Sequence, residues 1–170
     1  MGGVLSREEI GNLINEDPPL IEGFVGLDEQ LQPNGFDLTL RELAMFDSSG
    51  QITVRNTGRV LSAMAPLVFD GLGRIDLVAG IYLVTYNEVV NMPRNVMALA
   101  RPRSSLLRCG VSIDTAVWDA GYRGRSQSLM VVYNSRGIRL EKNARVTQLV
   151  FMKLSGNTNG YQGVFQNENI

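Results

Sequence analysis

Short apolar or alternating runs occupy most of the chain after residue 30. Turn-forming clusters such as DSSG (47–50), DGLG (70–73) and NSRG (134–137) separate these runs. Runs of this length bounded by Gly, Asn, Ser and Pro are typical of strands, and many short strands at this spacing indicate a sandwich or a barrel. The pattern therefore predicts a mainly β protein. The expected strands are residues 36–40, 52–55, 81–86, 96–100, 129–133, 138–140 and 146–154.

One short amphipathic helix is expected near the start of the chain, in the stretch SREEIGNLINED. Ser6 and Glu9 have the spacing of a capping box, in which each side chain accepts a hydrogen bond from the other residue's backbone amide. Ile10, Leu13 and Ile14 fall on one helical face. The two prolines that follow should end the helix.

The last fifteen residues differ in composition from the rest. GNTNGYQGVFQNENI (156–170) is rich in Gly, Asn and Gln, which predicts a tail that is mobile or that orders on a ligand. We therefore expect a β-barrel domain over residues 1–155 and a tail over 156–170. The run LMVVY (129–133) is apolar at every position, so its strand should be covered on both faces, which in a small barrel suggests a subunit contact.

Composition narrows the possible partners. With 170 residues, 44% hydrophobic and 19% charged, the chain should fold as a globular domain with a sizeable core. A net charge of −1 predicts no broad attraction to nucleic acid or anionic lipid. No apolar run approaches the roughly 18 residues of a membrane span. The single cysteine, Cys109, favours a reducing compartment or indifference to redox conditions, and a cytoplasmic location is expected.

Histidine is absent from the sequence. A His general base, a Ser-His or Cys-His pair and a His-containing metal site are therefore excluded. Any hydrolytic chemistry must rely on carboxylates, and any metal should be a hard ion bound by oxygen.

The densest group of hydrogen-bond donors lies in RPRSSLLRCG (101–110). Ser104 is expected to cap a short helix, where its hydroxyl and the free amides of the first turn would face an anion. Arg103, Ser105 and Arg108 would add a hydroxyl and two guanidinium groups, a set suited to a polyphosphate. A capped turn with solvated arginines is the alternative interpretation.

A second polar stretch, DTAVWDAGYRGR, covers residues 114–125. The glycines on either side of Tyr122 predict a tight hairpin that brings backbone close to another group. Tyr122 could offer a flat face to a sugar or base, and Asp119 could orient a water or accept a hydroxyl hydrogen bond. An ordinary hairpin with an ordinary Asp and Tyr is the alternative.

Taken in order, RSSLLRCG and TAVWDAGYRG resemble the paired signature of the dUTPase and dCTP deaminase superfamily. LSREEI and QPNGFDLTL (32–40) resemble its deaminase-like branch, ARVTQLVF (144–151) its late strand and YQGVFQ (161–166) its closing tail. Length and opening are most similar to the archaeal members with dUTPase activity. The resemblance implies a distorted jelly-roll-like β-barrel, assembled as a homotrimer with active sites between subunits.

The resemblance also assigns roles to matching residues. Arg103, Ser104, Ser105 and Arg108 would bind the triphosphate of dUTP, with Ser104 or Arg108 facing the bond that is cleaved. Asp119 would hold the sugar 3′-hydroxyl and the attacking water. Asp119, Arg108 and Ser104 are thus the expected catalytic residues.

The remaining matches concern the sugar, the base and the tail. Tyr122 would stack on the deoxyribose and leave no room for a 2′-hydroxyl. Gln148 and the backbone near Ala116 would line the base or phosphate pocket, and Tyr161 and Gln162 would close over the nucleotide.

Mg²⁺ is the expected cofactor, held mainly by the phosphates and by waters. The resemblance offers Asp37 as a structural residue or an outer-sphere metal contact, and no direct protein ligand.

The two activities of the superfamily require different residues. Deamination needs a proton-shuttling glutamate three residues before an asparagine, and here Val131 precedes Asn134. No acidic residue lies between Gly121 and Asn134, and Glu141 comes only after a further turn. The sequence therefore favours a dUTP diphosphatase that releases dUMP and pyrophosphate. The alternatives are a dCTP deaminase or bifunctional enzyme, and a non-catalytic nucleotide-binding module. Gln127 could contact the base or be an ordinary strand residue.

Overall fold

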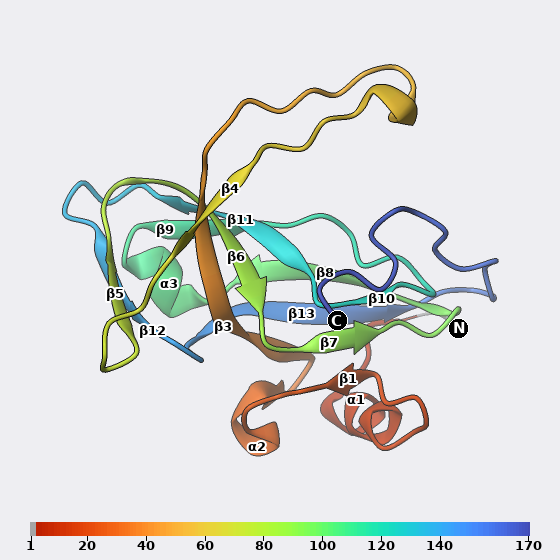
Figure 1. Ribbon diagram of the computed structural model, residues 1–170. Helices are drawn as coiled ribbons and strands as arrows, with labels where there is room; N and C mark the ends of the chain where they lie inside the picture. Colours follow the sequence, from red (N-terminus) through yellow and green to blue (C-terminus); the bar gives the residue numbers. More distant parts are fainter. Residues whose placement is uncertain (1–2) are drawn as a thin grey trace.

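A computed structural model describes residues 3–170 and shows a β-sheet that curls into a nearly closed barrel (Figure 1). The strand order is β8-β13-β3-β6-β11-β9, with β2 and β4 also pairing with β3. The predicted mainly β, barrel-like fold is therefore confirmed. The strands are β2 (Leu31–Gln32), β3 (Gly35–Phe46), β4 (Met64–Leu67), β6 (Gly80–Tyr86), β8 (Val96–Pro102), β9 (Val111–Asp114), β11 (Gln127–Val132) and β13 (Arg145–Lys153).

Strand β3 joins the two halves of this sheet. Its first part pairs with β13 and its second part with β6, and the register shifts by one residue between Leu40 and Glu42. An extra residue of this kind bends a strand and increases its twist, which lets one strand serve both walls. Residues 35–40 are all buried, because the barrel interior covers one face of β3 and other segments cover the opposite face.

Two smaller sheets complete the β structure. One has the order β1-β7-β10 and the other pairs β12 with β5, all antiparallel. The strands are β1 (Ile21–Glu22), β5 (Arg74–Leu77), β7 (Val89–Asn91), β10 (Arg123–Gly124) and β12 (Ile138–Glu141).

Helix α1 (Arg7–Ile14) is the predicted N-terminal helix. Ser6 Oγ accepts from Glu9 N, and Glu9 Oε2 accepts from Ser6 N, so the predicted capping box is present. Ile10 and Ile14 are buried. The helix ends before the two prolines. Two further helices are α2 (Leu27–Gln30) and α3 (Ser104–Arg108).

A long arm, residues 47–63, connects β3 to β4 and projects from the barrel (Figure 1). The strand predicted at 52–55 is wrong: this stretch pairs with no other strand among residues 3–170, and a short 3₁₀ helix (Asn56–Gly58) follows it. The apolar side chains that suggested the strand are exposed, Ile52 at 81% and Val54 at 105% of their full accessible surface. Their pattern therefore does not reflect burial within one chain.

The tail packs against the barrel. Tyr161 N donates to Ala120 O at 2.8 Å, and Asn167 N donates to Arg123 O at 2.7 Å. The division at residue 155 stays a prediction, and residues 1 and 2 of the expected domain lie outside the described part. Among residues 3–170, no helix is long and apolar enough to cross a membrane.

Candidate active site

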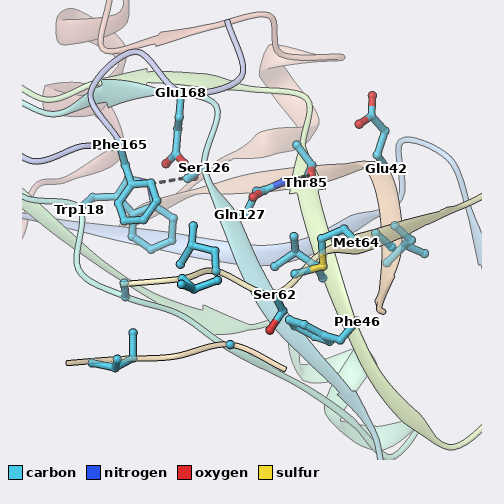
Figure 2. Close-up of a pocket in the computed structure, with 18 of the residues that line it drawn as sticks. Glu42, Phe46, Ser62, Met64, Thr85, Trp118, Ser126, Gln127, Phe165 and Glu168 are labelled. Atoms are coloured by element: carbon cyan, nitrogen blue, oxygen red, sulfur yellow. Dashed lines mark hydrogen bonds between the residues drawn. The ribbon is translucent and has the colours of Figure 1, made fainter. Parts of the chain in front are cut away.

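A cavity of about 920 Å³ opens between the arm and the segment that follows β9 (Figure 2). One wall comes from the arm and from the strands β3 and β4 beside it. The other comes from residues 116–119, Tyr122, the start of β11 and the tail. Mostly apolar walls with a few polar groups are typical of a small-molecule site. The polar and charged lining side chains include Glu42, Ser62, Thr85, Asp119, Tyr122, Ser126, Gln127, Tyr161 and Glu168.

The segment carrying Asp119 is held rigidly at both ends. Trp118 exchanges two backbone hydrogen bonds with Ala98 of β8, and its indole Nε1 donates to Ser126 Oγ at 3.0 Å. Gly121 turns the chain with a φ of +82°, and a Cβ built there would lie 2.6 Å from Gly160 Cα. Only glycine suits this close approach.

Asp119 lines the cavity and is exposed. Within residues 3–170, its carboxylate forms no hydrogen bond and no ion pair. Its backbone carbonyl accepts from Tyr122 N at 3.1 Å. The carboxylate is thus presented to the cavity by a fixed backbone and is available to a water or a hydroxyl group.

Tyr122 forms part of the same wall, yet only 6% of its surface is exposed. Its hydroxyl donates to Glu168 Oε1 at 2.7 Å. The ring of Tyr161 lies edge-on to it, with centroids 5.7 Å apart and planes at 80°. Burial, and then the adjacent Glu168 carboxylate, raise the pKa of the Tyr122 hydroxyl far above its ordinary value.

Two carboxylates of the cavity, Glu42 and Glu168, were missed from the sequence. Glu42 is exposed and pairs with Arg41 at 3.0 Å. Glu168 is half-buried, and burial raises its pKa, while the hydrogen bond from Tyr122 opposes that shift. No local motif marks Glu168, because its contact with Tyr122 joins residues 46 positions apart.

Gln127 also lies in the cavity wall, where its Nε2 donates to Thr85 Oγ1 at 2.9 Å (Figure 2). The amide is therefore oriented by the neighbouring strand β6. Its role in contacting a base stays open.

The arginine-serine group lies on and beside α3. The expected cap is wrong: Arg103 occupies the N-cap position with an extended backbone, and Ser104 is the first helical residue. Arg103 N donates to Val146 O of β13 at 3.0 Å, which holds Arg103 in an extended conformation, and the helix begins one residue earlier than predicted. Ser104, Ser105 and Arg108 are exposed.

Asp37 lies on β3 with only 1% of its surface exposed. Its Oδ2 pairs with Arg103 Nε at 3.2 Å and with Arg145 Nη1 at 3.5 Å. Burial raises the pKa of this carboxyl, and the two arginines oppose that shift. Asp37 therefore restrains the Arg103 side chain, while its buried Oδ1 has no hydrogen-bond partner among residues 3–170.

A single chain brings only part of the predicted site together. The cavity lining includes Ala116, Asp119, Tyr122 and Tyr161. α3 lies at the opposite end of the barrel from β10 and the C-terminal tail (Figure 1). The predicted site residues outside the lining are Asp37, Arg103, Ser104, Ser105, Arg108, Gln148 and Gln162.

Residues 4–154 match the family model described as dCTP deaminase-like. The chain belongs to this family. The predicted superfamily is thus confirmed, and the match covers the whole barrel. The tail after residue 154 lies outside the matched range.

Full-length relatives come from archaea. Proteins named probable deoxyuridine 5′-triphosphate nucleotidohydrolase in Methanosarcina mazei and Archaeoglobus fulgidus are 50% and 47% identical over 167 residues, which is 98% of this chain and 98% of each relative. A deoxyuridine 5′-triphosphate nucleotidohydrolase of Methanocaldococcus jannaschii is 34% identical over 140 residues, which is 82% of this chain and 88% of the relative.

A solved structure of 2′-deoxycytidine 5′-triphosphate deaminase from Agrobacterium tumefaciens shares the fold. Its TM-score is 0.67 at 22% identity, and the match covers 89% of this chain. The chain spans about half (49%) of the length of that protein. The likeness extends to the fold alone.

Proposed function

We propose that this protein is a dUTP diphosphatase, which hydrolyses dUTP to dUMP and pyrophosphate. One observation carries the proposal: the full-length archaeal relatives named for this activity are up to 50% identical. The cavity supports it, because a free carboxylate, Asp119, lies beside an aromatic ring, Tyr122, in a pocket large enough for a nucleoside.

The proposed site is completed by another copy of the chain, in a homotrimer. Within one chain, α3 lies at the opposite end of the barrel from β10, the strand that follows Asp119 (Figure 1), so the guanidinium groups and the carboxylate act together only across an interface. Exposed apolar residues on the outer face of the sheet support such an interface, including Ile81 at 55% and Tyr133 at 68% of full exposure.

In this site, Asp119 orients the attacking water in line with the α-phosphorus and accepts its proton. Arg103 and Arg108 neutralise the charge that develops on the phosphates, while Ser104 and Ser105 donate hydrogen bonds to their oxygens. Asp37 pairs with the Nε of Arg103 and so restrains the guanidinium group that faces the phosphates.

The other residues bind the nucleoside and close the site. Tyr122 lies against the deoxyribose, and Ala116 and Gln148 line the base or phosphate pocket. Tyr161, which is in contact with Tyr122, and Gln162 close over the bound nucleotide.

Mg²⁺ is the proposed cofactor. Residues 3–170 contain no cluster of three carboxylate or thiol ligands for a metal, which fits an ion that arrives on the phosphates and keeps several waters. Of the two roles offered for Asp37, the structural one is favoured, because its Oδ1 is buried and presents no surface to a metal-bound water. Bound Mg²⁺ would neutralise charge on the triphosphate.

One observation favours a second activity, deamination of dCTP. The position expected for a proton shuttle holds Val131, and Glu141 pairs with Arg74 on the separate β5-β12 sheet. Glu168, however, lies in the cavity with a raised pKa, a property suited to a general acid or base. Its carboxylate is engaged by the Tyr122 hydroxyl, so we rank this activity second.

One assay separates the two activities. The purified protein is incubated with Mg²⁺ and either dUTP or dCTP, and pyrophosphate and ammonia are measured. Pyrophosphate from dUTP without ammonia from dCTP is expected. Ammonia release would establish the deaminase, and tight dUTP binding without turnover would indicate a binding module.

A cytoplasmic location and a small-molecule partner, with neither nucleic acid nor membrane, complete the proposal. The near-zero net charge supports a small-molecule partner over nucleic acid or an anionic membrane, and the single cysteine supports the cytoplasmic location.

A further inference from the structure

The tail places a carboxylate directly on the hydroxyl of Tyr122. The Tyr122 Oη to Glu168 Oε1 distance is 2.7 Å. Glu168 is partly buried, and both side chains line the cavity. Because only 6% of the Tyr122 surface is exposed, its hydroxyl has little access to solvent, and it donates its hydrogen bond to this carboxylate.

Backbone contacts fix the position of Glu168. Its carbonyl accepts from Arg125 N at 3.0 Å, and the preceding Asn167 N donates to Arg123 O at 2.7 Å. The side chain of Gln166 bonds both Arg123 N and Gly121 O, each at 3.0 Å. The tail thus forms a parallel bridge with β10, between Glu168 and Gly124, and this main-chain contact places the Glu168 side chain beside Tyr122.

The tyrosine ring is restrained on three sides. A Cβ at Gly124 would lie 2.4 Å from Tyr122 Oη and 3.1 Å from Glu168 Cγ, so the pair packs directly onto the glycine backbone. The Tyr161 ring lies edge-on to the third side. Loss of Glu168 would open one side and remove the short hydrogen bond that the buried hydroxyl donates.

We propose that Glu168 is a positioning residue that holds the Tyr122 ring where it excludes the 2′-hydroxyl of a ribonucleotide. This inference rests on the proposed function, in which Tyr122 faces the sugar. A ring held in place rejects UTP by steric overlap, while dUTP fits without strain. Discrimination between the two sugars therefore depends on the tail, although Glu168 itself need not touch the nucleotide.

A purely structural role for Glu168 leads to a different result. If the carboxylate only stabilised the tail, its loss would lower turnover of dUTP and UTP by the same factor. If it positions Tyr122, its loss raises the relative turnover of UTP. The ratio of kcat/KM for the two substrates separates these cases.

The test compares that ratio in the wild-type chain, Glu168→Ala, Glu168→Gln, Tyr122→Phe and the Glu168→Ala/Tyr122→Phe double variant. Glu168→Ala should lower the dUTP-to-UTP ratio by about tenfold, the factor expected for one hydrogen bond. Glu168→Gln should stay within about threefold of wild type, because its amide oxygen still accepts from the hydroxyl. The double variant should lose no more than the larger single loss.

Asn169→Gly is the matched control. It deletes a neighbouring tail contact, from Asn169 Nδ2 to Arg125 O at 2.9 Å, at a φ of +54° that glycine accepts. Its ratio should equal that of wild type. Melting temperatures of all variants identify any that fail to fold. If Glu168→Ala fails to fold, Tyr122→Phe, which removes the same hydrogen bond, decides between the two roles: a lowered dUTP-to-UTP ratio supports positioning, and an unchanged ratio overturns it.

The outcomes separate this inference from the proposed function. Wild-type hydrolysis of dUTP with an unchanged ratio in Glu168→Ala overturns the inference alone, as does a double variant with additive losses. A wild-type chain that leaves dUTP intact overturns the proposed function and the inference together.

Discussion

Replacement of Asp119 by Asn should abolish most turnover while leaving the fold intact. The carboxylate is exposed and has no hydrogen bond or ion pair among residues 3–170, so the variant should keep its free energy of unfolding within about 0.5 kcal/mol. The amide cannot accept a proton from the attacking water. Loss of a general base typically costs about 10²–10⁴ in rate, which corresponds to about 3–5 kcal/mol in the activation barrier.

The assay follows pyrophosphate release with saturating dUTP and Mg²⁺, and measures the affinity for a non-hydrolysable dUTP analogue separately. We expect kcat to fall and the affinity to change little. Asp114→Asn is the matched control, because Asp114 is an exposed aspartate at the end of β9 outside the cavity lining. A near-normal kcat in Asp119→Asn would remove Asp119 from the mechanism.

Three further predictions concern buried and strained positions. Asp37→Ala should lower the free energy of unfolding, measured by urea denaturation, by about 1–3 kcal/mol, because Arg103 and Arg145 lose their partner. An unchanged free energy of unfolding would contradict the inference that Asp37 restrains Arg103. Glu88 lies between β6 and β7, fully buried, and its carboxylate accepts hydrogen bonds from Thr39 N and Oγ1. Burial raises its pKa, so the free energy of unfolding should fall as pH rises from the unfolded-chain pKa through the higher native one. Glu88→Gln should lack this component, and parallel pH profiles of the variant and the wild type would contradict the prediction. Gly121→Ala should displace the tail, because the added Cβ would lie 2.6 Å from Gly160 Cα. Limited proteolysis after residue 155 should then be faster than in the wild type, and an unchanged cleavage rate would argue against the contact between Gly121 and Gly160.

Strands with a strongly apolar pattern could be predicted from the sequence. The runs at 129–133 and 146–154 correspond to β11 and β13, whose side chains alternate between buried and less buried positions. The run at 52–55 has a similar pattern but lies in the exposed arm. A local pattern shows that side chains are apolar, and whether a neighbouring segment covers them is decided by the rest of the fold.

Parts of the site that depend on distant contacts were beyond sequence reasoning. Ala116, Asp119, Tyr122 and Tyr161 were all predicted, and the structure brings them to one cavity. Glu168 was missed, because its place beside Tyr122 is set by pairing of the tail with β10. The position of Ser104 was also misjudged, because pairing of Arg103 with β13 sets the first residue of α3.

The arginine group presents a different difficulty. Its residues were predicted as part of the site, yet one chain places α3 at the far end of the barrel from the tail. In the proposed site, the arginines and Asp119 therefore come from different copies of the chain.

Complementation between two inactive variants tests the central claim most directly. Asp119→Asn and Arg108→Ala chains are refolded together, and mixed assemblies are isolated through two different tags. If each site of the proposed trimer takes its aspartate from one copy and its arginine from another, a mixed trimer of either composition has both intact residues in about one third of its sites. Recovery of about one third of wild-type dUTP hydrolysis is expected, and mixed assemblies no more active than the separate variants would contradict the account.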